Sequence, residues 1–123
     1  MATVFFVNFV SFVIFVSFVI QNTSKGRHMA AYVVLNIEVT NPEQYAGYVK
    51  AAGATVEQYG GRYLVRGGRA EKLEGSLDPK RIVVLEFPSL ERARAWWDCE
   101  AYREPKALRQ SASISDTILV EGV

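Results

Sequence analysis

Cysteine and histidine are almost missing from this 123-residue sequence, which contains one of each, Cys99 and His28. A single cysteine excludes an internal disulfide, and the two residues together cannot build a structural zinc site or a histidine-based catalytic triad. The sequence also lacks a Walker loop and the G-x-G-x-x-G signature of dinucleotide-binding proteins. We therefore expect no metal and no cofactor, and any chemistry must come from carboxylates, tyrosines and arginines.

Charge is absent from residues 1–24, and the segment 4–20 consists of Val, Ile and Phe apart from one Asn and two Ser. A transmembrane helix of this length would span about 26 Å and would hold the following basic residues on the cytoplasmic side. A secretory signal fits less well, because no basic residue precedes the apolar run and no small-x-small cleavage site follows it. Valine recurs with a period of three, which matches neither a helix nor a strand. A misplaced start or a cloning remnant is therefore the favoured interpretation.

The sequence thus divides into an apolar extension, residues 1–28, and a domain, residues 29–123, in which the function must lie. The domain is close to neutral, with 12 Lys plus Arg against 13 Asp plus Glu. A nucleic-acid-binding domain would show a clustered basic excess, so nucleic acid is not an expected partner. We expect a cytoplasmic protein that meets a membrane only if residues 1–28 belong to it.

Patterns of apolar residues predict the secondary structure of the domain. Alternating residues indicate four strands, at 32–39, 62–66, 81–87 and 114–121. Asn41 is suited to cap the first helix and the pair Gly60-Gly61 to end it. Ser89 is suited to cap a second helix, and a short helix is expected at 104–110. The order β-α-β-β-α-β predicts an α+β, ferredoxin-like fold with helices on one face of an antiparallel sheet.

Both faces of the predicted sheet carry apolar side chains. When helices cover one face of an antiparallel sheet, the other face is commonly polar. Here the face away from the helices keeps five aliphatic residues: Val34, Ile82, Val84, Ile118 and Val120. A second copy of the domain would cover them, so we expect a homodimer with two sheets packed face to face. Scattered surface aliphatics are the alternative.

Several stretches of the domain resemble a known family. They are YGGRYLVRGG at 59–68, EGSLDP at 74–79, RIVVLEFPSLERARAWW at 81–97 and AYREPKALR at 101–109. Together they resemble the domain of unknown function 1330 family over nearly all of residues 30–123. The resemblance implies a dimeric α+β barrel related in architecture to small monooxygenases of antibiotic biosynthesis, muconolactone isomerases and stress-responsive barrel proteins. It implies no particular reaction.

Polar residues at positions that should be buried are the candidates for a functional site. Glu86 shares a strand face with aliphatic residues and is the expected catalytic acid or base. The alternative is a structural ion pair with an arginine of an adjacent strand, Arg62 or Arg66. Arg66 and Arg109 are expected to converge with Glu86 on one cavity, where an arginine could bind an anionic group. The full set of expected ligand-binding residues is Arg62, Arg66, Trp97, Tyr102, Arg109 and Tyr48.

These residues predict a protein that binds a small anionic or aromatic organic molecule in each subunit. If the protein is an enzyme, a cofactor-independent isomerase, lyase or monooxygenase fits the available groups. A non-catalytic ligand-binding or stress-response module is the alternative.

Overall fold

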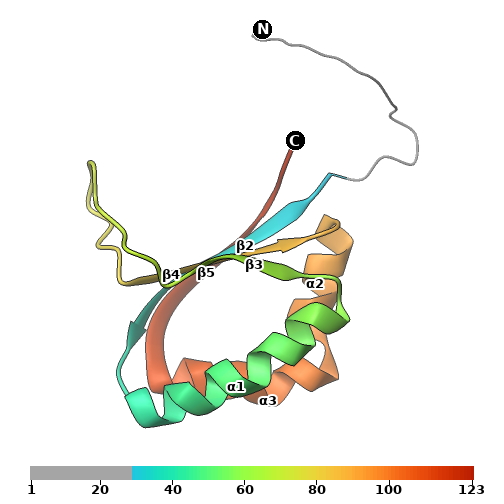
Figure 1. Ribbon diagram of the computed structural model, residues 1–123, viewed down its shortest axis with the longest axis horizontal. Helices are drawn as coiled ribbons and strands as arrows, with labels where there is room; N and C mark the ends of the chain where they lie inside the picture. The colour runs from blue at the N-terminus through green and yellow to red at the C-terminus, as the bar shows by residue number, and fades with distance from the viewer. Residues whose placement is uncertain (1–28) are drawn as a thin grey trace, which may run out of the picture.

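The computed structural model describes residues 29–123 (Figure 1), and the expectations for residues 1–28 lie outside this range. Its elements in chain order are β2 (Ala31–Val39), α1 (Pro42–Gln58), β3 (Arg62–Arg66), β4 (Arg81–Phe87), α2 (Leu90–Asp98), α3 (Glu100–Ala112) and β5 (Ser113–Glu121). The predicted α+β, ferredoxin-like fold is confirmed.

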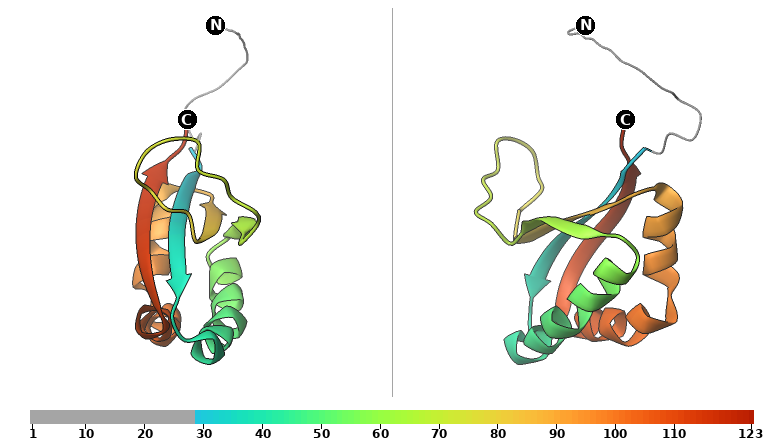
Figure 2. Two further views of the ribbon diagram at one scale, coloured as in Figure 1. Left: turned by 90° about the vertical axis from the view of Figure 1, so that its left-hand side faces the viewer. Right: turned by 45° about the vertical axis from the view of Figure 1, so that its right-hand side comes forward.

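The strands form one antiparallel sheet in the order β3-β4-β2-β5. Helix α1 connects β2 to β3, and β4 lies between these two strands, as in a split βαβ unit. Figures 1 and 2 show that α1, α2 and α3 lie on the same side of the sheet. The sheet therefore has one face covered by helices and one open face.

The helix starts follow the predicted capping residues. The side chain of Asn41 accepts a hydrogen bond from the backbone nitrogen of Gln44 (3.2 Å), and that of Ser89 accepts one from Arg92 (3.1 Å). After α1, Gly60 takes a positive φ of 79°, which glycine adopts without steric cost.

The third helix is longer than the predicted segment 104–110. It begins at Glu100 and continues through Pro105. A proline inside a helix removes one backbone hydrogen bond, which favoured a later start in the sequence. The helix nevertheless begins four residues before the predicted start, because its inner face, which includes Tyr102 and Arg109, is buried against the rest of the domain.

The core lies between the helices and the covered face of the sheet. Strand β2 contributes Ala31, Val33, Leu35 and Ile37, and β4 contributes Val83, Leu85 and Phe87. Trp96 of α2 is fully buried, and its indole nitrogen donates to the hydroxyl of Thr55 at 3.0 Å. That hydroxyl donates in turn to the carbonyl of Ala52 at 2.7 Å, so the buried polar groups of Trp96 and Thr55 are both satisfied.

The open face of the sheet is partly apolar, as predicted. Val34 is paired with Val84 of β4 on one side and with Ile118 of β5 on the other. The two central valines are half-buried, whereas 61% of Ile118 and 46% of Val120 is exposed on the edge strand. An aliphatic surface thus crosses three strands on the side away from the helices.

Candidate functional site

Glu86 lies on the open face of the sheet, in register with Tyr32 of β2 and Arg62 of β3. Arg62 Nε donates to Glu86 Oε1 at 2.7 Å, and the Tyr32 hydroxyl donates to Oε2 at 3.2 Å. The hydrogen bond from Arg62 lowers the pKa of the Glu86 carboxyl, and that from Tyr32 acts in the same direction. The structure thus shows the alternative, an arginine–glutamate ion pair across adjacent strands, and Arg62 rather than Arg66 is the partner.

The expectation that Glu86 converges with Arg109 on one cavity is wrong. Successive residues of a strand point to opposite faces, and the neighbours Leu85 and Phe87 are the residues buried under the helices. Arg109 belongs to α3, on the helix side of the sheet. The body of the sheet thus separates the carboxylate from the arginine.

Arg66 lies at the end of β3, with its guanidinium 4.1 Å from the centre of the Tyr63 ring. It lines a small hollow of about 20 Å³ on the helix side, together with Tyr45, Tyr48 and Arg81. This volume accommodates about one water molecule. Arg66 and Arg109 therefore both lie near Tyr48. The larger hollow that Arg66 lines, of about 360 Å³, lies instead between α1 and β3, where Arg62 and Glu57 also line it.

Arg109 is the most unusual residue of the domain, because its charged side chain is only 1% exposed. Its Nη1 donates to the hydroxyl of Ser115 at 2.7 Å, whereas Nε and Nη2 have no hydrogen-bond partner among the described residues. The guanidinium carbon lies 5.8 Å from the ring centre of Tyr48 and 5.7 Å from that of Trp97. Its position in the last turn of α3 lets the helix dipole offset part of the cost of burying the charge.

Two buried phenols lie beside this arginine. The hydroxyl oxygens of Tyr48, on α1, and Tyr102, on α3, are 3.0 Å apart. Burial raises the pKa of Tyr48 far above its ordinary value, and the neighbouring Tyr102 raises it further. The Tyr48 phenol is therefore protonated at neutral pH. Of the predicted residues, the structure brings Arg109, Trp97, Tyr102 and Tyr48 together and leaves Glu86 and Arg62 on the other face.

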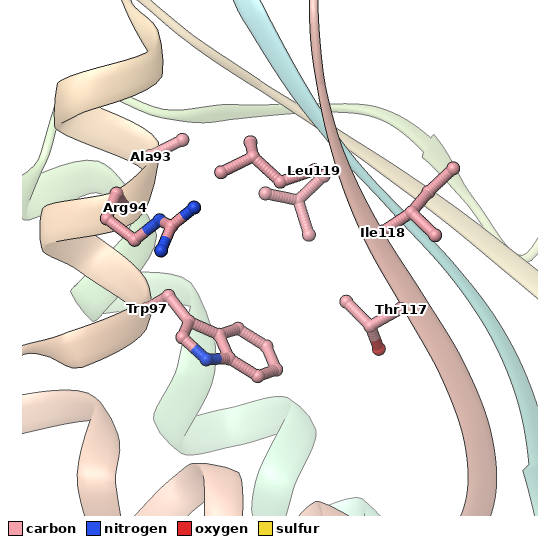
Figure 3. Close-up of a pocket in the computed structure, with 7 residues that line it drawn as sticks. Ala93, Arg94, Trp97, Thr117, Ile118 and Leu119 are labelled. Atoms are coloured by element: carbon pink, nitrogen blue, oxygen red, sulfur yellow. The ribbon is translucent and has the colours of Figure 1, made fainter.

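A cavity of about 240 Å³ adjoins this cluster between α2 and β5. It is lined by Val33, Ala93, Arg94, Trp97, Thr117, Ile118 and Leu119. Figure 3 shows the guanidinium of Arg94 turned into the space between helix and strand, and the indole of Trp97 reaching from α2 towards Thr117. Trp97 therefore contributes both to the wall of this cavity and to the surroundings of Arg109.

Lys106 adds a further positive charge next to Trp97. Its amino group donates to the Trp97 carbonyl at 2.8 Å and lies 4.4 Å from the centre of the Trp97 ring. Arg94, Lys106 and Arg109 thus surround one indole, and within residues 29–123 none of them forms an ion pair. This side of the domain is suited to a negatively charged ligand.

The sequence analysis missed Arg94, Lys106 and Thr117. Two signals were present in the sequence. Arg94 precedes Trp97 by three residues and so lies on the same side of a helix. In addition, the side chains of β5 that face the helices include the small residues Ser113, Ser115 and Thr117, whereas those of β2 on the same face are larger and aliphatic. These small side chains leave room for the cavity and a hydroxyl for Arg109.

Neither a metal centre nor a membrane span is evident in the described part of the chain. Residues 29–123 contain no group of three or more His, Cys, Asp or Glu side chains placed to bind a metal ion. No helix in this range is both long enough and apolar enough to cross a bilayer.

The sequence of the domain matches a known protein family. Residues 30–123 match the family described as Domain of unknown function (DUF1330). The chain is a member of this family. No protein with a curated description matches it.

Similar folds occur in crystal structures of several bacterial proteins. The DUF1330 chain is similar to the RPA0582 protein of unknown function from Rhodopseudomonas palustris, with a TM-score of 0.65 and 21% identity over 79% of this chain and 85% of that one. It also resembles SnoaB, a cofactor-independent oxygenase from Streptomyces nogalater, with a TM-score of 0.49 and 13% identity over 74% and 90% of the two chains. At these identities the likeness extends to the fold alone.

Proposed function

We propose that this DUF1330 protein binds a small organic anion with a flat or aromatic body, on the helix side of its sheet. The observation that carries the proposal is Arg109, a buried guanidinium whose Nε and Nη2 have no hydrogen-bond partner within residues 29–123. Burying a charge without a counter-ion is costly, and buried polar groups are nearly always hydrogen-bonded. An anionic ligand would supply both the counter-charge and the missing acceptors.

The neighbouring cavity defines the size and character of this ligand. Its volume of about 240 Å³ lies just below the range of about 300–1,000 Å³ that is usual for ligand pockets, so a molecule with a single ring fits best. Trp97 offers a flat surface, Val33 and Leu119 offer apolar contacts, and Arg94 provides a positive charge. Such a lining would bury the apolar part of a ligand and orient its negatively charged group towards Arg94.

Binding without chemistry is the function that the site supports best, as in a ligand-binding or stress-response module. Glu86, the expected acid or base, is paired with Arg62 on the opposite face of the sheet. A cofactor-independent isomerase, lyase or monooxygenase is the second candidate. It is favoured by the phenols of Tyr48 and Tyr102 beside Arg109, which could donate a proton to a bound substrate.

We also propose that the protein works as a homodimer. The open face of the sheet exposes aliphatic residues on three strands, among them Val34, Val84 and Ile118. Contiguous apolar patches of this kind often mark protein interfaces. A second copy packed on this face would leave the helix side, where the cavity between α2 and β5 lies, uncovered in each subunit.

Ligand binding is tested by titrating the full-length chain with benzoate, and with benzyl alcohol as a neutral ligand of similar size, followed by calorimetry. We expect benzoate to bind at least about tenfold more tightly, since hydrogen bonds to a charged partner contribute about 1.5–3 kcal/mol. The variant Arg109→Gln should lose this preference, whereas Arg103→Gln, an exposed change on the same helix, should keep it. Equal binding of both compounds, or no binding of either, would overturn the proposal.

A further inference from the structure

The free nitrogens of Arg109 share one edge of its guanidinium. Nη1 lies on the same side as the side-chain stem and is occupied by Ser115 at 2.7 Å. Nε and Nη2, which remain free, point their N–H groups in parallel from the opposite edge. An arginine edge of this kind can bind a carboxylate through two parallel hydrogen bonds, a planar geometry for which arginine is especially suited.

No acidic residue of the described part of the chain occupies this edge. Carboxylates form ion pairs within residues 29–123 at Glu71, Asp78, Glu86 and Glu100, and each pairs with a different basic residue that is more exposed than Arg109. The positive charge is flanked by the neutral rings of Tyr48 and Trp97. The carboxylate that would complete the geometry must therefore come from outside this part of the chain.

The phenol pair supplies a third donor. Two phenols carry two hydroxyl protons, but the contact of 3.0 Å between Tyr48 and Tyr102 uses only one of them. The second proton has no acceptor among the hydrogen bonds of the described residues. When Tyr102 donates to Tyr48, the Tyr48 hydroxyl, whose ring lies beside Arg109, is left free to donate.

We infer that Arg109 and Tyr48 form a receptor for the carboxylate of a small aromatic acid. The two N–H groups of the free arginine edge bind the two carboxylate oxygens, and the Tyr48 hydroxyl donates to one of them. Trp97, which borders both the receptor and the larger cavity, contacts the aromatic ring. This inference rests on the proposed function and narrows its ligand from any organic anion to a planar carboxylate.

Several features of the site agree with a carboxylate rather than a tetrahedral anion. Two donors lie in the plane of the guanidinium, which matches two oxygens of a planar group. A sulfonate or phosphonate would carry a third oxygen out of this plane, where the two coplanar donors cannot reach it. The raised pKa of Tyr48 keeps its hydroxyl protonated, so that it donates over the whole physiological pH range.

The first test compares benzoate with benzenesulfonate on the full-length chain by calorimetry. Both anions carry one negative charge on the same ring, but only benzoate is planar. We expect benzoate to bind about tenfold more tightly, and Arg109→Lys to weaken benzoate about a hundredfold, because lysine keeps the charge but loses the two parallel hydrogen bonds. If Arg109→Lys binds benzoate as tightly as the parent, the receptor is refuted.

The second test separates the two phenols. Tyr48→Phe removes the third donor and should weaken benzoate about tenfold. Tyr102→Phe leaves the Tyr48 hydroxyl free to donate and should weaken it by about threefold at most. Tyr59→Phe, at the far end of α1, serves as the control and should leave binding unchanged. If the pair had only a structural role, Tyr48→Phe and Tyr102→Phe would weaken benzoate binding equally.

A measurement on the unmodified chain avoids any effect of substitution on folding. The Nε–H proton of Arg109 is followed by nuclear magnetic resonance while benzoate is added, and we expect a downfield shift that benzyl alcohol does not produce. No shift, together with equal affinity for benzoate and benzenesulfonate, would overturn the carboxylate receptor while the proposed function stands. If neither anion binds the chain at all, both proposals fail.

Discussion

Replacing Arg109 by methionine separates a ligand-binding arginine from a structural one. Methionine fills a similar volume without charge, so the variant removes the buried guanidinium and its single hydrogen bond to Ser115. That bond contributes about 1.5–3 kcal/mol, whereas each of the two nitrogens without a partner costs about 1–3 kcal/mol, and more for a charged donor. We expect the variant to be more stable than the parent by about 2 kcal/mol in the absence of ligand.

Urea unfolding followed by circular dichroism measures this difference. With a slope of about 2 kcal/mol per molar urea, the midpoint should rise by about 1 M. The melting temperature should rise by about 8–16 °C, given about 4–8 °C for each kcal/mol in a domain of this size. Saturating benzoate should stabilise the parent but not Arg109→Met, because only the parent binds it.

Arg103→Met is the matched control on the same helix. Arg103 is exposed and pairs with Glu100 at 2.6 Å, and surface pairs of this kind contribute about 0–1 kcal/mol. Its loss should therefore change stability little. A loss of about 3–5 kcal/mol in Arg109→Met would show that the arginine completes a buried structural network, and would refute the reasoning.

Three further predictions concern the dimer, Glu86 and the apolar extension. Light scattering should give a mass of about 28 kDa, twice that of the 13.8 kDa chain, and a monomeric parent would contradict the dimer. Val84→Lys should reduce the mass to that of the monomer, whereas Ala95→Lys, on the outer side of α2, should not. Because Arg62 lowers the pKa of Glu86, this pair should stabilise the fold above the ordinary carboxyl pKa of about 4.3 and lose its effect as the pH falls below it. Glu86→Gln should abolish this pH dependence in urea midpoints and leave benzoate binding unchanged. Deleting residues 1–28 should not alter the melting temperature, and a drop of several degrees would show that they pack on the domain.

The local structure followed from short-range patterns in the sequence. The alternation in 32–39 and 81–87, the caps Asn41 and Ser89, and the glycine after α1 each act over a few residues, so they determine strands and helix ends without knowledge of the rest. The order of these elements then limited the topology to a ferredoxin-like sheet. The length of α3 was the exception, because tertiary burial outweighed the cost of Pro105.

The candidate site was only half visible in the sequence. Arg109, Trp97, Tyr102 and Tyr48 were named as ligand-binding residues, and the structure places them together. Glu86 was assigned to the same cavity because it shares a strand face with the aliphatic residues Ile82 and Val84, and in the structure that face is the open one. Alternation shows that two residues lie on opposite faces, but it does not show which face the helices cover.

The sequence by itself determined the secondary structure, the order of the elements and the presence of apolar residues on both faces of the sheet. Only the tertiary structure decided that Glu86 pairs with Arg62 on the open face and that Arg109 is buried without a counter-ion among residues 29–123. It also placed the hydroxyls of Tyr48 and Tyr102, 54 residues apart in the chain, at 3.0 Å. The physical reason is that capping and alternation act between neighbours in sequence, whereas the partners of a buried charge are set by how α1 and α3 pack against the sheet.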